Sequence, residues 1–267
     1  MLIFPLLPMK QFLSLLLGSL FLLSACTVPT ASQHGGGHTT KGLEAHALAL
    51  QDQSNETEIA FRITEDNKTF MDFGISHTKE MHLIVVRDDL QHFAHLHPTR
   101  DESGTWRVTY AAPAGGKYWL YADFVESNQS AHTIRFKRTH TGDLGEYGIL
   151  KSVETTQHVG NGGGYDITMD ATTLGDGGVQ FNYWIYDVMG ADQKLETYLG
   201  ELGHSVLISP SGEFVHVHPF KEYVGYDATN RTHPVFVTGP LEDPYYRVFT
   251  QFQIKGKIIT VEYDWQR

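Results

Sequence analysis

The feature that most limits the possible folds is an internal repeat. Residues 82–98 read HLIVVRDDLQHFAHLHP and residues 204–219 read HSVLISPSGEFVHVHP, so the two segments differ in length by one residue. Flanking segments match at a similar offset, 58–64 with 179–185 and 118–124 with 246–252. Self-similarity at a constant spacing indicates that one structural module was copied. The chain of 267 residues is therefore expected to contain two copies of one module.

Each module has the pattern of an antiparallel β structure. Short apolar segments rich in β-branched and aromatic residues alternate with clusters of Gly, Pro, Asp and Asn, and no helical period is sustained. About seven short strands in a module of this size predict an immunoglobulin-like β-sandwich. The fold class is thus all-β, with two tandem sandwiches at residues 43–138 and 165–267. Residues 139–164, which contain the glycine-rich run 160–164, are expected to form the linker.

The N-terminus has the order of a secretory signal. Lys10 precedes an apolar stretch at 12–23, which is shorter than the ~20 residues that a membrane-spanning helix needs. The sequence Leu-Ser-Ala-Cys at 23–26 resembles the lipobox of bacterial lipoproteins, whose cysteine receives a diacylglycerol and becomes the first residue of the mature chain. We therefore expect a signal peptide at 1–25, lipidation of Cys26 and a flexible tether at 26–42. The predicted location is extracytoplasmic, on the periplasmic or cell-surface side, with the lipid as the contact to the membrane.

Composition narrows the function classes. A net charge of −11 argues against nucleic acid as a partner, because phosphate binding needs a basic surface. The single cysteine excludes an internal disulfide framework and a Cys-rich zinc ribbon. Histidine is prominent, with 15 residues against 20 Lys and Arg together.

The repeated segment predicts a hairpin in each module. A register centred on the loop places His82 opposite His97 and Ile84 opposite His95. Residues two apart on a strand share a face, and opposed Cβ atoms lie ~4.5–5.5 Å apart. Each hairpin is therefore expected to gather three imidazoles on one face (His82, His95 and His97 in the first copy; His204, His216 and His218 in the second).

Three neutral imidazoles at this spacing suit copper, zinc or nickel and disfavour ions that prefer oxygen. The sequence thus predicts a divalent transition metal, copper or zinc, as cofactor, with one ion in each repeat. The alternative is a cell-surface adhesion or assembly module whose histidines only hydrogen-bond across the sheet. Met81 is expected to point away from His82, because neighbours on a strand face opposite sides. The histidines unmatched between copies are expected to be solvated linker or loop residues (His34, His38, His46, His77, His92, His132, His140, His158 and His233).

The motifs at 81–86, 93–98 and 198–204 resemble those of secreted or lipid-anchored bacterial proteins with tandem immunoglobulin-like domains. These proteins are similar in style to the CopC-like and YtkA-like copper-associated domains. The resemblance implies a role in heavy-metal handling, most directly of copper, although this chain lacks the Met-rich segment of CopC-type sites. The expected function is to buffer or deliver the metal, with a metal-transport or metal-sensing protein as partner.

Enzyme motifs are missing from the sequence. It contains no Gly-X-Ser-X-Gly elbow, no phosphate-binding loop and no zincin helix motif. A metal-dependent hydrolase would need a general base, and Asp123 is the carboxylate expected near the first triad. Its counterpart in the second copy is Gln251, so the two copies do not share such a base. The sequence therefore favours a binding protein without catalytic residues.

The lipobox leads to a test of the anchor. Replacing Cys26 with Ser should abolish lipid labelling and release the protein into the soluble fraction or leave it unprocessed, because the thiol is the acceptor. Metabolic labelling with a radioactive fatty acid measures this directly. Normal labelling of the Cys26→Ser protein would contradict the lipoprotein assignment.

Overall fold

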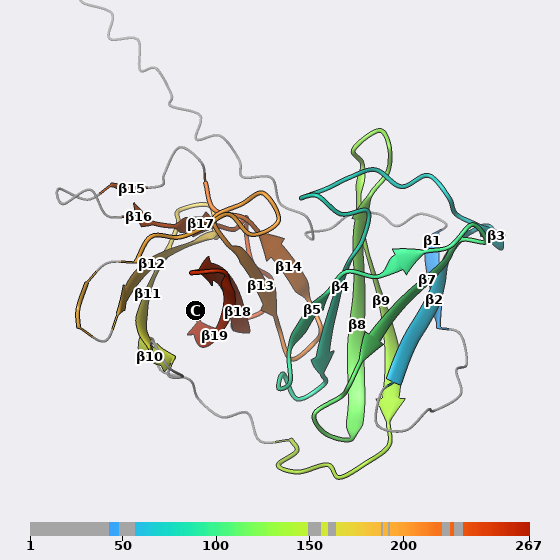
Figure 1. The fold of residues 1–267 in the computed structure, drawn as a ribbon, viewed down its shortest axis with the longest axis horizontal. Coiled ribbons are helices and arrows are strands. Elements are labelled where there is room, and N and C mark those ends of the chain that lie inside the picture. Colours follow the sequence, from blue (N-terminus) through green and yellow to red (C-terminus); the bar gives the residue numbers. More distant parts are fainter. Residues whose placement is uncertain are drawn as a thin grey trace, which may run out of the picture.

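The computed structural model describes residues 43–47, 57–148, 156–159, 164–187, 189–191, 193–220, 225–226 and 232–267. The predicted signal peptide, Cys26, the tether and its two histidines lie outside these residues. Within them the protein is all-β, and no helix is long and apolar enough to cross a membrane. Figure 1 shows two bodies, one coloured blue to green and the other yellow to red.

The first body is a sandwich of two antiparallel sheets. One sheet has the order β1-β2-β7-β6 with β3 beside β2, and the other has the order β5-β4-β8-β9. The strands are β1 (Leu43–Ala47), β2 (Thr57–Glu65), β3 (Lys68–Thr69), β4 (His82–Arg87), β5 (Ala94–Leu96), β6 (Thr99–Arg100), β7 (Thr105–Tyr110), β8 (Gly116–Val125) and β9 (Ala131–His140).

The second body repeats this arrangement. Its sheets have the orders β10-β11-β12-β17 and β14-β13-β18-β19, and a short ribbon pairs β15 with β16. The strands are β10 (Thr156–Val159), β11 (Tyr165–Thr173), β12 (Val179–Asp187), β13 (His204–Ile208), β14 (Phe214–Val217), β15 (Gly225–Tyr226), β16 (Thr232–His233), β17 (Val235–Val237), β18 (Tyr245–Ile254) and β19 (Lys257–Gln266). The sheet β14-β13-β18-β19 matches β5-β4-β8-β9 strand for strand, so the chain consists of two tandem immunoglobulin-like sandwiches.

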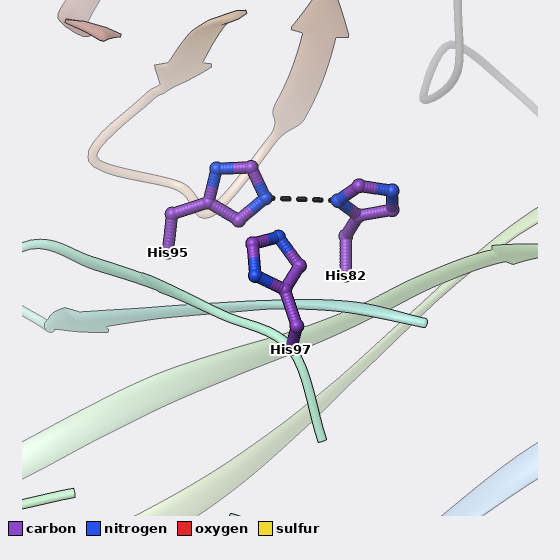
Figure 2. A group of neighbouring side chains, drawn as sticks. All are labelled: His82, His95 and His97. Atoms are coloured by element: carbon purple, nitrogen blue, oxygen red, sulfur yellow. Dashed lines mark hydrogen bonds between the residues drawn. The ribbon is translucent and has the colours of Figure 1, made fainter. Parts of the chain in front are cut away.

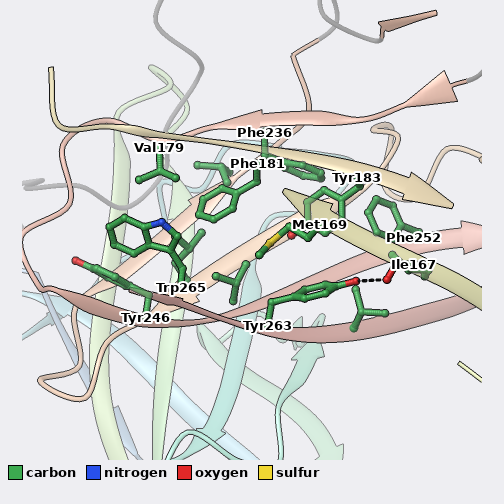
Figure 3. Packing of buried hydrophobic residues seen from close by; sticks show 14 of the residues in the cluster. Ile167, Met169, Val179, Phe181, Tyr183, Phe236, Tyr246, Phe252, Tyr263 and Trp265 are labelled. Carbon is green, nitrogen blue, oxygen red and sulfur yellow. Dashed lines mark hydrogen bonds between the residues drawn. The ribbon is translucent and has the colours of Figure 1, made fainter. Parts of the chain in front are cut away.

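Each sandwich has its own apolar core. In the second, alternate residues of β12 point inward, and Phe181 and Tyr183 pack against Phe252 and Tyr263 (Figure 3). The Tyr263 hydroxyl donates a hydrogen bond of 2.9 Å to the carbonyl oxygen of Ile167 on the facing sheet. This satisfies a buried polar group and ties the two layers together.

Three of the strands that carry the histidines, β4, β13 and β14, are buried on both faces. In β4, Leu83 and Val85 point into the first sandwich, whereas Ile84 and Val86 point outward. Those outward side chains are nevertheless buried, because they pack against Val206 and the rest of the equivalent face of the second sandwich. A continuous apolar run is the pattern of a strand covered on both sides.

Aromatic pairs join the two sandwiches in a reciprocal way. Phe93 of the first stacks on Phe249 of the second, with ring centroids 4.4 Å apart. Phe214 of the second stacks on Tyr121 of the first at 4.6 Å. Phe93 and Phe214 are equivalent positions of the repeat, as are Tyr121 and Phe249. This is the pattern of an isologous, two-fold interface formed within one chain.

The interface leads to a prediction about stability. Replacing Phe249 with Ala should lower the free energy of unfolding by about 3–5 kcal/mol, since the fully buried ring would leave a cavity between the sandwiches. Urea unfolding measures this. The control is Ile258→Ala on β19 of the same sheet, where the side chain is 40% exposed and the expected change is within about 0.5 kcal/mol. A loss below about 1 kcal/mol for Phe249→Ala would show that the interface adds little to stability.

Candidate metal centre

The hairpin register places the histidines as the sequence predicts. Ile84 pairs with His95 in the first copy, and Val206 pairs with His216 in the second. His82, His95 and His97 therefore gather on the outward face of the first hairpin (Figure 2), and His204, His216 and His218 on that of the second. In each triad the three potential ligand atoms lie within 4.8 Å of one another. Both clusters can hold a metal ion.

The two triads lie against each other at the interface. Ring centroids of His82 and His216 are 5.8 Å apart, and those of His95 lie 5.7 Å from both His204 and His216. The sequence predicts two separate sites, one in each module. The structure instead joins them into one six-histidine cluster, because the two outward faces pack together.

Outer hydrogen bonds fix the proton on two rings of the first triad. The Nε2–H of His82 donates to the carbonyl oxygen of Ser76 at 3.1 Å, and a carbonyl can only accept. The Nδ1–H of His95 donates to Oε1 of Gln251 at 2.9 Å, while the Gln251 Nε2 donates to Thr260. The remaining nitrogens of the two neutral rings, His82 Nδ1 and His95 Nε2, therefore both present lone pairs.

These two lone pairs face each other at 3.0 Å (Figure 2). Neutral rings can share a proton there only if one outer acceptor loses its donor, which is costly for a buried group. Two basic nitrogens that converge while their outer N–H groups are held by acceptors form the arrangement of metal-bound histidines.

The second triad repeats the arrangement. The Nε2–H of His204 donates to the carbonyl oxygen of Tyr198 at 2.9 Å, and the Nδ1–H of His216 donates to Oδ2 of Asp123 at 2.9 Å. His204 Nδ1 and His216 Nε2 are left facing each other at 3.4 Å. Two nitrogens bound to one tetrahedral ion at 2.0–2.1 Å lie about 3.4 Å apart. His204 Nδ1 and His216 Nε2 already have this separation.

The third histidine of each triad supplies a third potential nitrogen ligand. The ring of His97 lies 4.8 Å from that of His95, and its Nε2 is buried with no hydrogen-bond partner among the described residues. The ring of His218 lies 4.6 Å from both His204 and His216. Each triad can thus supply three nitrogen ligands and leave a fourth position open.

Burial keeps the imidazoles of His95, His97 and His204 neutral. Desolvation, followed by the charges of His82, Lys79 and His216, lowers the pKa of His97 to about 3. Burial also holds the pKa values of His95 and His204 well below the ordinary value, with the surrounding histidines as the next cause. Since only neutral imidazole binds a metal, these three rings are in their metal-binding form at neutral pH.

Asp123 was expected near the first triad, and its carboxylate also reaches the second. It pairs with His82 across the ladder of its own sheet, as its position predicts. Its carboxylate, however, crosses the interface and accepts from His216 of the second triad. Gln251 crosses in the opposite direction to His95. Asp123 therefore lies beside the first triad, as expected, while its carboxylate binds a histidine of the second triad because the two faces pack together.

Three histidines expected to be solvated are not: His132 and His140 are buried, and His77 is half-buried. His77 lies in a turn in which Ser76 pairs with Lys79, and its ring stacks on His218 at 3.7 Å. His132 and His140 lie on β9 with 8% and 7% exposure, and His132 contacts Glu126 at 2.6 Å. No repeat signal identifies His77, since its counterpart is Leu199. Met81 points into the first core, as expected, so its sulfur does not face the cluster.

One of three comparisons with known proteins identifies the family of this chain. No curated protein matches the chain. Among solved structures it is similar to a mutant alpha-2-macroglobulin of Salmonella, with 12% identity and a TM-score of 0.25. That match covers 86% of this chain but 15% of the other, so it carries no inference about function. The model of a family described as a domain of unknown function, DUF8832, matches residues 38–142 and 157–266. Since these segments include both sandwiches and most of the sequence, the chain belongs to the DUF8832 family.

Proposed function

We propose that this protein is an extracytoplasmic, lipid-anchored metal-binding protein that buffers or delivers a divalent transition metal through its interface histidines. The observation that carries the proposal is the pair of converging lone pairs in each triad, His82 with His95 and His204 with His216. A purely structural network would place a proton between each pair, whereas the ring protons are on the outer nitrogens, which donate to the outer acceptors.

The donor set selects the class of metal. Six imidazoles without a thiolate among the described ligands suit Cu²⁺, Zn²⁺ or Ni²⁺, whereas Ca²⁺ and Mg²⁺ prefer oxygen. Copper is favoured over zinc by the resemblance of the histidine motifs to copper-associated domains. Membrane attachment through Cys26 would place such a protein where it can meet a metal-transport or metal-sensing partner.

The degree of exposure supports exchange of the ion with a partner. His95 and His97 are only partly buried, in contrast to the fully buried second triad. An ion held by partly accessible ligands can be passed on by stepwise replacement of those ligands. The fourth coordination position then accepts the first ligand of the receiving protein.

The proposed function predicts metal binding. The purified full chain should bind Cu²⁺ or Zn²⁺ at neutral pH, and replacing both His97 and His218 with Ala should abolish tight binding because each triad loses a ligand. Isothermal titration calorimetry measures the affinity. The matched control is His92→Asn, in the same hairpin but outside the triads. If Cu²⁺, Zn²⁺ and Ni²⁺ all fail to bind, the histidines are structural and the adhesion module is the better account.

The buried histidines also predict how the stability of the protein depends on pH. Histidines of the unfolded chain take up protons near pH ~6.5. The pKa values of His95 and His204 lie well below this in the folded protein, and that of His97 is about 3. The unfolded state therefore binds more protons below pH 6.5, and stability should fall continuously as the pH drops from there toward 3.

Urea unfolding of the metal-free protein from pH 7.5 to 4.5 measures this effect. His97→Gln should make the dependence shallower, because one group that resists protonation is removed. A stability that stays level or rises as the pH falls would contradict neutral burial of these rings. Zn²⁺ should still bind at pH 5.5, where a free histidine peptide has lost most of its affinity.

A further inference from the structure

The hydrogen bonds that hold the ligand histidines obey the internal symmetry, except that one of the acceptors differs in charge. The carbonyl oxygens of Ser76 and Tyr198 hold equivalent histidines, His82 and His204. The crossing contacts are also equivalent in position, but one acceptor is the carboxylate of Asp123 and the other is the amide of Gln251.

The surroundings of these two acceptors match as well. Asp123 accepts a hydrogen bond of 2.7 Å from the Thr133 hydroxyl on the adjacent strand. Gln251 donates one of 3.0 Å to Thr260, which occupies the equivalent place beside it. The two sites therefore differ at this position by a negative charge and little else.

That charge acts on the second triad. A carboxylate that accepts the Nδ1–H of a ligand histidine makes the opposite nitrogen more basic and strengthens its bond to a metal. The Asp123 side chain is 5% exposed, so water and salt screen its attraction for a dication only weakly. Gln251 orients His95 in the same way but adds no charge.

The second triad is also more deeply buried than the first, which favours tighter binding there as well. His204, His216 and His218 are 1%, 1% and 6% exposed, and the ring of His77 lies over His218. In the first triad only His82 is fully buried. The second triad is thus better shielded from competing ligands, while the first is open to exchange.

Resting on the metal-binding function above, we propose that the cluster is a two-ion centre with unequal sites. The second triad holds a resident divalent transition-metal ion, and the first triad holds the exchangeable ion that is taken up and passed on. Asp123, contributed by the first repeat, is the residue that makes the second site the tighter one. The resident ion also fixes the interface, because its ligand His216 is held by the opposite sandwich.

Isosteric substitutions test the proposal. Zn²⁺ alone is the probe, added to the metal-free full chain, with native mass spectrometry for stoichiometry and calorimetry for affinity. The wild type should bind two ions in two resolved steps. Asp123→Asn should weaken the tighter step by about 10–100-fold and leave the weaker step nearly unchanged. Gln251→Glu should strengthen the weaker step, and the double variant should reverse the order in which the triads fill.

Ligand variants assign each step to a triad. His218→Ala should remove the tighter step and His97→Ala the weaker one, and in the Asp123→Asn/Gln251→Glu background these assignments should exchange. Thermal unfolding in EDTA checks that each variant folds. If one substitution at the crossing positions prevents folding, the other still tests the proposal.

The possible outcomes distinguish failure of the unequal two-ion centre from failure of the proposed metal-binding function. A stoichiometry of one ion, two equal steps, or an Asp123→Asn protein with unchanged affinities would overturn the unequal centre while leaving metal binding intact. A wild type that binds no Zn²⁺, Cu²⁺ or Ni²⁺ would overturn the proposed function and this inference with it.

Discussion

The packing of one sheet face from each sandwich against the other is the interaction on which the rest of the structure depends. Without it, Ile84, Val86 and their counterparts would expose apolar surface, and the histidines at the ends of the same strands would be hydrated. Exposed imidazoles titrate near pH ~6.5 and compete with water for any metal. Covering them by a second copy removes water, lowers the pKa values of His95 and His204 and aligns outer N–H groups on fixed acceptors. The metal centre is therefore a consequence of the interface.

An isologous interface inside one chain has a property that a homodimer lacks. In a homodimer both halves carry the same residue at every position, so two symmetric sites have equal affinities until the first ion binds. Here the halves are free to differ, and the crossing acceptors are Asp123 on one side and Gln251 on the other. Similarly, His77 in one turn corresponds to Leu199 in the other, so only the second triad is covered by an imidazole.

Much of the site could be predicted because β structure has a strict period of two. Once His82 and His97 were placed at the ends of a hairpin, the common face of the three imidazoles followed, and the observed pairing of Ile84 with His95 confirms it. The burial of His132 and His140 was missed because neither belongs to the repeated motif. The continuous apolar runs 83–86 and 206–208 indicate strands covered on both faces, but a sequence pattern does not say what covers them.

The sequence alone determined the duplication, the β-sandwich class, the hairpin register and the membership of each triad, because these follow from local periodicity and self-similarity. The tertiary structure decided that the triads meet, that Asp123 serves the opposite repeat and that His77 lies over His218. These are contacts between residues about 90 to 160 positions apart, and they depend on how two rigid sandwiches dock. Local pattern specifies which face of a strand a side chain occupies, whereas shape and charge complementarity over the whole face specify what it meets.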